Sequence, residues 1–130
     1  MEILNPKGWP RPKGYSNGML AQGKLVFVAG QVGWDETETI CSENFAEQVG
    51  QSLRNIAAVL AEAGAKPEHI TRMTWFITSK EEYGSSLKTI GTYYKEIIGR
   101  HFPAMSVIVV AGLIEDGAKV EIEATAVIPH

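Results

Sequence analysis

The sequence has little cysteine, few histidines and no long apolar run, and each shortage excludes a class of protein. The single cysteine, Cys41, cannot form an internal disulfide. The three histidines are scattered, without the spacing of a zinc site, so we expect no metal cofactor. No stretch approaches the roughly 20 apolar residues of a membrane helix, and residues 1–6 lack the basic start and apolar core of a signal peptide. We therefore expect a cytoplasmic protein without a membrane partner.

Positive charge is also in short supply. Twelve Lys and Arg residues against fifteen Asp and Glu give a net charge of −3, whereas non-specific nucleic-acid binding depends on a broad positive surface. We therefore expect no nucleic-acid partner. Hydrophobic residues make up 45% and charged residues 21% of the chain, close to the globular average, which excludes a disordered or fibrous protein. The length of 130 residues predicts a single domain over residues 1–130.

The start of the chain is rich in proline and glycine. Residues 1–18 form a predicted arm. Within it, the segment Asn5–Gly18 contains Pro6, Pro10 and Pro12, and proline lacks the N–H group that a sheet requires, so we expect this segment to lie over the domain and not to be the interior of a strand. After the arm, apolar residues at 19–21 and 25–29 flank a Gly-containing turn. This pattern predicts a β-hairpin.

Apolar residues at spacings of three and four predict two helices. The first follows Ser42, which we expect to be its N-cap, and stops at Gly64. The second begins near Tyr83 and ends near Gly99. Strands are predicted at 70–78, which is rich in β-branched and aromatic residues, at the apolar segment 105–111, and at 119–127, which alternates between apolar and polar residues.

The resulting order, ββαβαββ, predicts an α+β fold with two helices on one face of a sheet. Segments 25–29 and 105–111 are apolar on both faces, and two helices cover only one of them. Because monomers rarely leave large apolar patches in water, we predict a homo-oligomer that buries the uncovered faces. Glu121 and Glu123 project to the same face, about 7 Å apart. Buried carboxylates need partners or solvent, so we expect these to face a cleft between subunits.

Several residues could carry chemistry, and each has a plainer alternative. Glu121 could activate water as a general base, or could be an exposed strand carboxylate. Tyr15 could close over a pocket with its phenol, or could only pin the arm. Trp34 could line a pocket or fill the core. Cys41 precedes a helix, but no histidine lies near it in the sequence, so we expect a structural role.

Three segments, Val26–Gln31, Phe102–Ser106 and Val120–Ala124, form a combination that is more specific than any of them alone. This combination resembles the reactive intermediate deaminase family (Rid, or YjgF-type), and the likeness extends from Tyr15 to Val127. The resemblance implies a chorismate-mutase-like fold, assembled as a homotrimer around a central barrel, with three ligand clefts between subunits. Active members of the family hydrolyse 2-imino and 2-enamino acids to 2-keto acids and ammonia without a metal or cofactor.

The sequence departs from this family at three polar positions. Met105 stands where the family has an arginine that pairs with the substrate carboxylate, and a thioether carries no positive charge. Gly91 stands in place of an asparagine, and Ala29 in place of a serine. These changes predict a larger and less polar cleft. Arg72 and Arg100 could restore the charge from elsewhere, or could remain solvated on the surface.

The remaining residues implied by the resemblance are present. Tyr15 matches the arm tyrosine, Glu121 matches the water-positioning glutamate, and the backbone amide of Val107 matches a carboxylate-binding donor. We add Gly30, beside Ala29, and Trp34 as further candidates for contact with the ligand. We therefore predict a cofactor-free hydrolase of imine or enamine C=N bonds that acts on substrates other than simple 2-imino acids. The alternative is a non-catalytic, ligand-binding or regulatory homotrimer.

Overall fold

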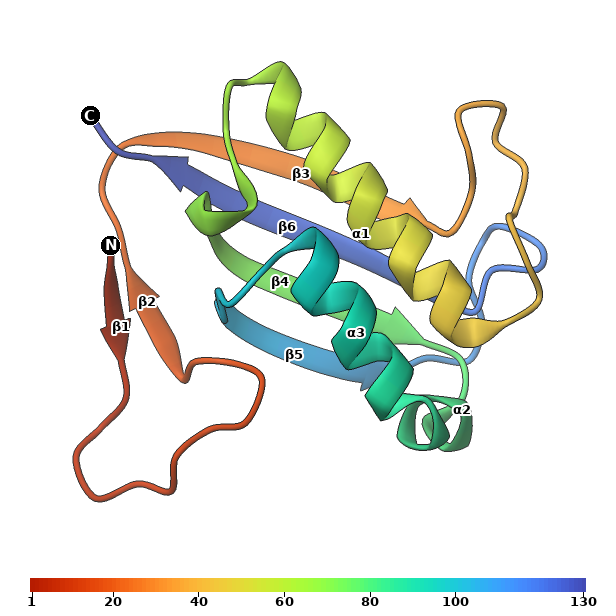
Figure 1. The fold of residues 1–130 in the computed structure, drawn as a ribbon, viewed down its shortest axis with the longest axis horizontal. Helices are drawn as coiled ribbons and strands as arrows, with labels where there is room; N and C mark the ends of the chain where they lie inside the picture. The colour runs from red at the N-terminus through yellow and green to blue at the C-terminus, as the bar shows by residue number, and fades with distance from the viewer.

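The computed structural model describes residues 1–130 and shows a four-stranded sheet with helices packed against it (Figure 1). The strands lie in the order β3–β6–β4–β5, with β4 and β5 parallel and the other neighbours antiparallel. β3 and β5 are therefore the two edges of the sheet. The strands are β3 (Lys24–Val32), β4 (Ile70–Ile77), β5 (Ala104–Val109) and β6 (Val120–Ile128).

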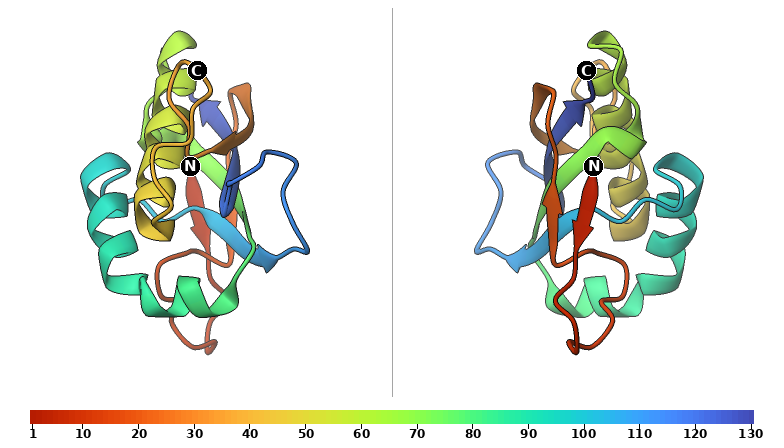
Figure 2. Two further views of the ribbon diagram at one scale, coloured as in Figure 1. Left: turned by 90° about the vertical axis from the view of Figure 1, so that its right-hand side faces the viewer. Right: turned by 90° about the vertical axis from the view of Figure 1, so that its left-hand side faces the viewer.

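The helices share one face of the sheet, as Figure 2 shows from the side. The opposite face, which we call the open face, carries no helix. The predicted α+β fold with its helices on one face is confirmed. The helical segments are α1 (Phe45–Glu62), a short 3-10 turn (Pro67–His69), α2 (Lys80–Ser85) and α3 (Leu87–Ile97).

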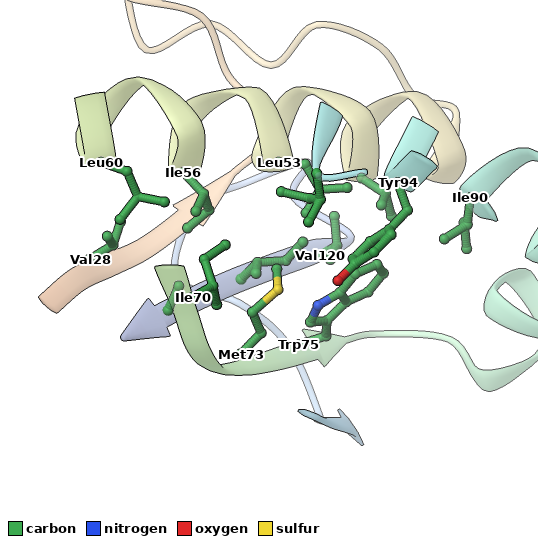
Figure 3. Close-up of a cluster of buried hydrophobic side chains, with 14 of the residues drawn as sticks. Val28, Leu53, Ile56, Leu60, Ile70, Met73, Trp75, Ile90, Tyr94 and Val120 are labelled. Atoms are coloured by element: carbon green, nitrogen blue, oxygen red, sulfur yellow. The ribbon is translucent and has the colours of Figure 1, made fainter. Parts of the chain in front are cut away.

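The hydrophobic core fills the space between the helices and the sheet (Figure 3). Leu53 and Ile56 of α1 are fully buried against Met73 of β4 and Ile122 of β6. Full burial of such a side chain contributes about 1.5–3 kcal/mol to stability. Because successive residues of a strand point to opposite faces, the neighbours of these core residues must lie on the open face.

The open face is apolar at its edges and polar in its middle. Leu25 and Phe27 of β3 are 60% and 73% exposed, and Ile108 of β5 is also exposed. Between them, Glu121 and Glu123 lie on β6. The expectation that strands 25–29 and 105–111 are apolar on both faces is therefore confirmed for the two edges.

One predicted pairing is wrong. Residues 19–21 do not form a hairpin with residues 25–29, because β2 (Gly18–Leu20) pairs with β1 (Glu2–Leu4) in a separate ribbon. The chain does not reverse at Gly23 but continues beside the last strand, so close to Ile128 that a Cβ on this glycine would overlap the Ile128 backbone. β1 was not predicted, because the prolines that follow it dominate the local composition.

The helix ends were predicted more accurately than the helix starts. Gly64 and Gly99 adopt φ values of +73° and +91° just beyond α1 and α3, where glycine is favoured. The N-cap of α1, however, is Asn44, whose Oδ1 accepts a hydrogen bond from the Glu47 amide at 2.9 Å. Ser42 lies earlier and accepts from the Asn44 amide. The second predicted helix is divided into α2 and α3.

Candidate functional site

A hollow of about 480 Å³ lies between the arm, the helices α2 and α3, and the edge strand β5. We call it the arm hollow. Four of the predicted site residues line it together: Tyr15, Gly91, Met105 and Val107. The β4 residue Trp75 is paired with Val107, and both side chains point toward the helix side of the sheet. The arm hollow therefore lies on the helix side, not on the open face.

Ser16 fixes the arm over this hollow. Its amide donates to the Pro103 carbonyl at 3.0 Å, and its hydroxyl donates to the Phe102 carbonyl. The side chain is almost fully buried, so these hydrogen bonds are shielded from water. Just before it, Gly14 has a φ of +76°, a conformation that glycine adopts without steric cost. Tyr15 is held between these two residues and remains 40% exposed.

The wall of the arm hollow is mostly apolar and aromatic. Eight of its eleven lining residues are hydrophobic, and none is an arginine. Burial raises the pKa of both Tyr83 and Tyr94, so both phenols stay protonated at neutral pH. The Tyr94 hydroxyl donates to the His101 carbonyl at 2.6 Å. A Cβ added at Gly91 would meet no atom within 4 Å, so this wall has open space beside it.

Three further predicted site residues form a second group, which we call the glutamate group: Ala29, Gly30 and Glu121. The Glu121 carboxylate lies against Gly30 so closely that a Cβ there would overlap it. Ala29 lines a depression of about 630 Å³ on the open face, together with Arg72 and Glu123. Because Val120 and Ile122 are fully buried on the helix side, Glu121 projects to the open face.

One chain does not bring the two groups together. Met105 and Val107 lie on β5, at one edge of the sheet, whereas Ala29 and Gly30 lie on β3, at the other edge. Glu121 lies on β6, next to β3, and on the opposite face from the arm hollow. A small ligand in the arm hollow cannot touch the glutamate group of the same chain.

Four further residues from the sequence lie outside both groups. Trp34 is half-buried, and its carbonyl accepts from the Asn55 side chain at 2.8 Å. Arg72 belongs to the open-face depression. Arg100 lines smaller hollows beside Tyr15 and beside Gly91, but not the arm hollow itself. Desolvation raises the pKa of the Cys41 thiol, which favours its un-ionised and less nucleophilic form.

Lys13, Tyr83 and Tyr94 also line the arm hollow, although they were not predicted as site residues from the sequence. Nothing in the local sequence distinguishes Lys13 from the other lysines, since its position depends on where the arm lies. The structure has no cluster of three or more His, Cys, Asp or Glu residues that could hold a metal ion. None of its helices combines the length and the hydrophobicity that crossing a membrane requires.

Comparison with known proteins gives a consistent result. The family model described as endoribonuclease L-PSP matches residues 10–128. A RutC family protein of Synechocystis is 35% identical over 99% of this chain and 98% of its own length. A Salmonella typhimurium protein named 2-iminobutanoate/2-iminopropanoate deaminase is 33% identical, covering 81% of this chain and 80% of the relative. The crystal structure of a Rid family protein from Yersinia pestis superposes with a TM-score of 0.84 at 27% identity, covering 98% of both chains.

Proposed function

This chain belongs to the endoribonuclease L-PSP family, which includes the Rid proteins, and on that basis we propose that it hydrolyses the C=N bond of an imine or enamine. The name of the Salmonella relative supports the reaction class. We base the proposed substrate on the lining of the arm hollow, which is mostly apolar, includes several aromatic residues and has no arginine. We infer a substrate bulkier than the simple 2-imino acids.

The placement of the two groups supports an assembled site. The arm hollow and the glutamate group lie toward opposite edges and on opposite faces of the sheet. We propose that they meet between copies, where the β5 edge of one copy lies beside the β3 edge of the next. Three copies joined in this way would form a closed ring and bury the exposed apolar side chains at the edges of the open face. We propose this homotrimer, with Glu121 of one copy completing the arm hollow of its neighbour.

The proposed reaction needs only water and a base. Glu121 accepts a proton from a water molecule as the water oxygen bonds to the imine carbon. The nitrogen takes this proton from Glu121, which gives a neutral tetrahedral adduct. Glu121 then removes the hydroxyl proton of the adduct and passes it to the nitrogen, so that ammonia leaves as the C=O bond forms. Tyr15 hydrogen-bonds the substrate from the arm, and the Val107 amide supplies a backbone donor. Met105 and Gly91 leave room for the substrate side chain.

The test measures ammonia release from imines that an amino-acid oxidase generates in situ. We expect the protein to accelerate ammonia release from the imine of phenylalanine more than from the imine of alanine. Glu121→Gln removes the base while keeping the shape of the side chain, and should lower the rate at least about 100-fold. Glu123→Gln, on the same strand and the same face, is the matched control and should retain activity.

Two results would count against the proposal. Equal rates for the wild type and Glu121→Gln would remove this carboxylate from the reaction. Tight binding of an imine analogue without any turnover would favour the non-catalytic, ligand-binding homotrimer. The absence of an arginine from the arm hollow is the observation that favours this alternative.

A further inference from the structure

The arm hollow contains one charged residue, Lys13, and no carboxylate. The structure has a single ion pair, between Lys119 and Glu82 at 3.0 Å, so the Lys13 ammonium has no acidic partner within the chain. An anion bound in the hollow would lie beside this cation, with the apolar wall excluding water from one side of the pair.

The backbone around Lys13 is anchored. Ser16 ties the arm to the residues that precede β5, and Gly14 makes the turn between Lys13 and Tyr15. The long side chain of lysine can follow an apolar wall while its ammonium group stays in water. Lys13 can therefore place its charge at the rim of the arm hollow without being desolvated itself.

The rest of the wall is suited to contact an apolar part of a ligand rather than a second charged group. Tyr15, Trp75, Tyr83 and Tyr94 supply aromatic surface, and the volume of about 480 Å³ falls within the range of small-molecule sites. The indole N–H of Trp75 is buried and has no acceptor in the protein, so one polar group of this wall is left without a partner. Open space beside Gly91 leaves room for a ring.

We propose that Lys13 is the anion-binding residue of the arm hollow, and that its ligand is a monocarboxylate with an aromatic side chain. One ammonium group balances one negative charge, which favours a carboxylate over a doubly charged phosphate. The inference rests on the proposed function, and it narrows the substrate to the anions of 2-imino acids with a large apolar side chain. Lys13 provides from the arm the positive charge that Met105 does not provide from β5.

The experiment measures binding rather than turnover. The assembled protein is titrated by calorimetry with 3-phenylpropanoate and with its uncharged analogue, 3-phenylpropanamide. We expect the wild type to bind the carboxylate more tightly than the amide. Lys13→Met should weaken carboxylate binding about tenfold and leave amide binding unchanged, because a hydrogen bond to a charged group is lost. Lys13→Arg should retain the preference.

Lys88→Met is the matched control. It removes the same charge from an exposed position on α3 that does not line the arm hollow, and should leave both affinities unchanged. Carboxylate binding that is equal in the wild type and Lys13→Met would overturn the inference, and so would a wild type that does not bind the carboxylate. Binding that depends on Lys13, found together with no ammonia release from any imine, would uphold the inference and reject the hydrolase proposal.

Discussion

Two helix glycines differ sharply in what surrounds them. A Cβ added at Gly91 of α3 would meet no atom within 4 Å, whereas one added at Gly50 of α1 would lie 2.9 Å from the Tyr93 ring. Gly50 therefore permits the close approach of α1 and α3. Gly91 has no packing role of this kind, and its missing side chain enlarges the arm hollow instead.

This difference predicts opposite effects of the same substitution. Gly91→Ala should raise the free energy of unfolding by about 0.5–1 kcal/mol, because alanine is the better helix former and its methyl group is accommodated. Gly50→Ala should lower it, because the Tyr93 ring would have to move. Urea unfolding followed by circular dichroism, at one protein concentration, measures both. A destabilised Gly91→Ala would show that the space beside α3 is needed for folding.

At the scale of elements, α1 does more than cover the sheet. The fully buried side chain of Gln48 donates to the carbonyls of Ser42 and Gly117 at 2.8 and 3.0 Å. Its oxygen accepts from the Lys119 amide at 2.8 Å. The start of α1 is thereby joined to the residues just before β6. Because Glu121 follows Lys119 by two residues, these hydrogen bonds also help to fix the position of Glu121.

The N-cap of α1 can be tested by itself. Asn44→Ala removes the acceptor of the Glu47 amide and should lower the free energy of unfolding by about 1 kcal/mol. Asn44→Ser, which keeps an acceptor at the same position, should retain most of the stability. Chemical denaturation of the two variants beside the wild type distinguishes loss of the cap from loss of side-chain volume. Equal losses in both variants would mean that the hydrogen bond contributes little.

At the scale of the whole molecule, the open face is a surface on which large apolar side chains remain exposed to water. Leu25, Phe27 and Ile108 are exposed on its two edges, while the loop between β5 and β6 stands out from the same side (Figure 2). Exposed apolar area of this kind is typical of an interface. The same face carries the glutamate group, so assembly and completion of the site are one event in our proposal.

A charge on the apolar β3 edge of this surface should prevent assembly. Phe27→Asp places a carboxylate where an apolar contact is proposed, and should convert a species of about three times 14.2 kDa into one of 14.2 kDa in sedimentation equilibrium. Val59→Asp, at an exposed position on the helix side, is the control and should leave the mass unchanged. A wild type that sediments as a single chain would reject the homotrimer.

How far the fold could be predicted depended on the element. The apolar spacing from Phe45 to Leu60 sufficed for α1, and the alternation in 120–127 sufficed for β6, because each pattern reflects the geometry of its own segment. The partner of β2 could not be predicted. Strand pairing depends on hydrogen bonds to another segment, and a three-residue strand carries too little pattern to specify which one.

The sequence by itself determined α1, the two-sided apolar edge strands and the excess of acidic charge, since each follows from composition or from a local repeat. Through its resemblance to a family, it also predicted Tyr15, Gly91, Met105 and Val107 of the arm hollow, but not Lys13, Tyr83 or Tyr94. Only the tertiary structure decided that Lys13, Gly91 and Met105 share one hollow while Glu121 lies on the opposite face. The physical reason is that these residues come from separate elements, and their distances are set by how the arm, α3 and the sheet pack.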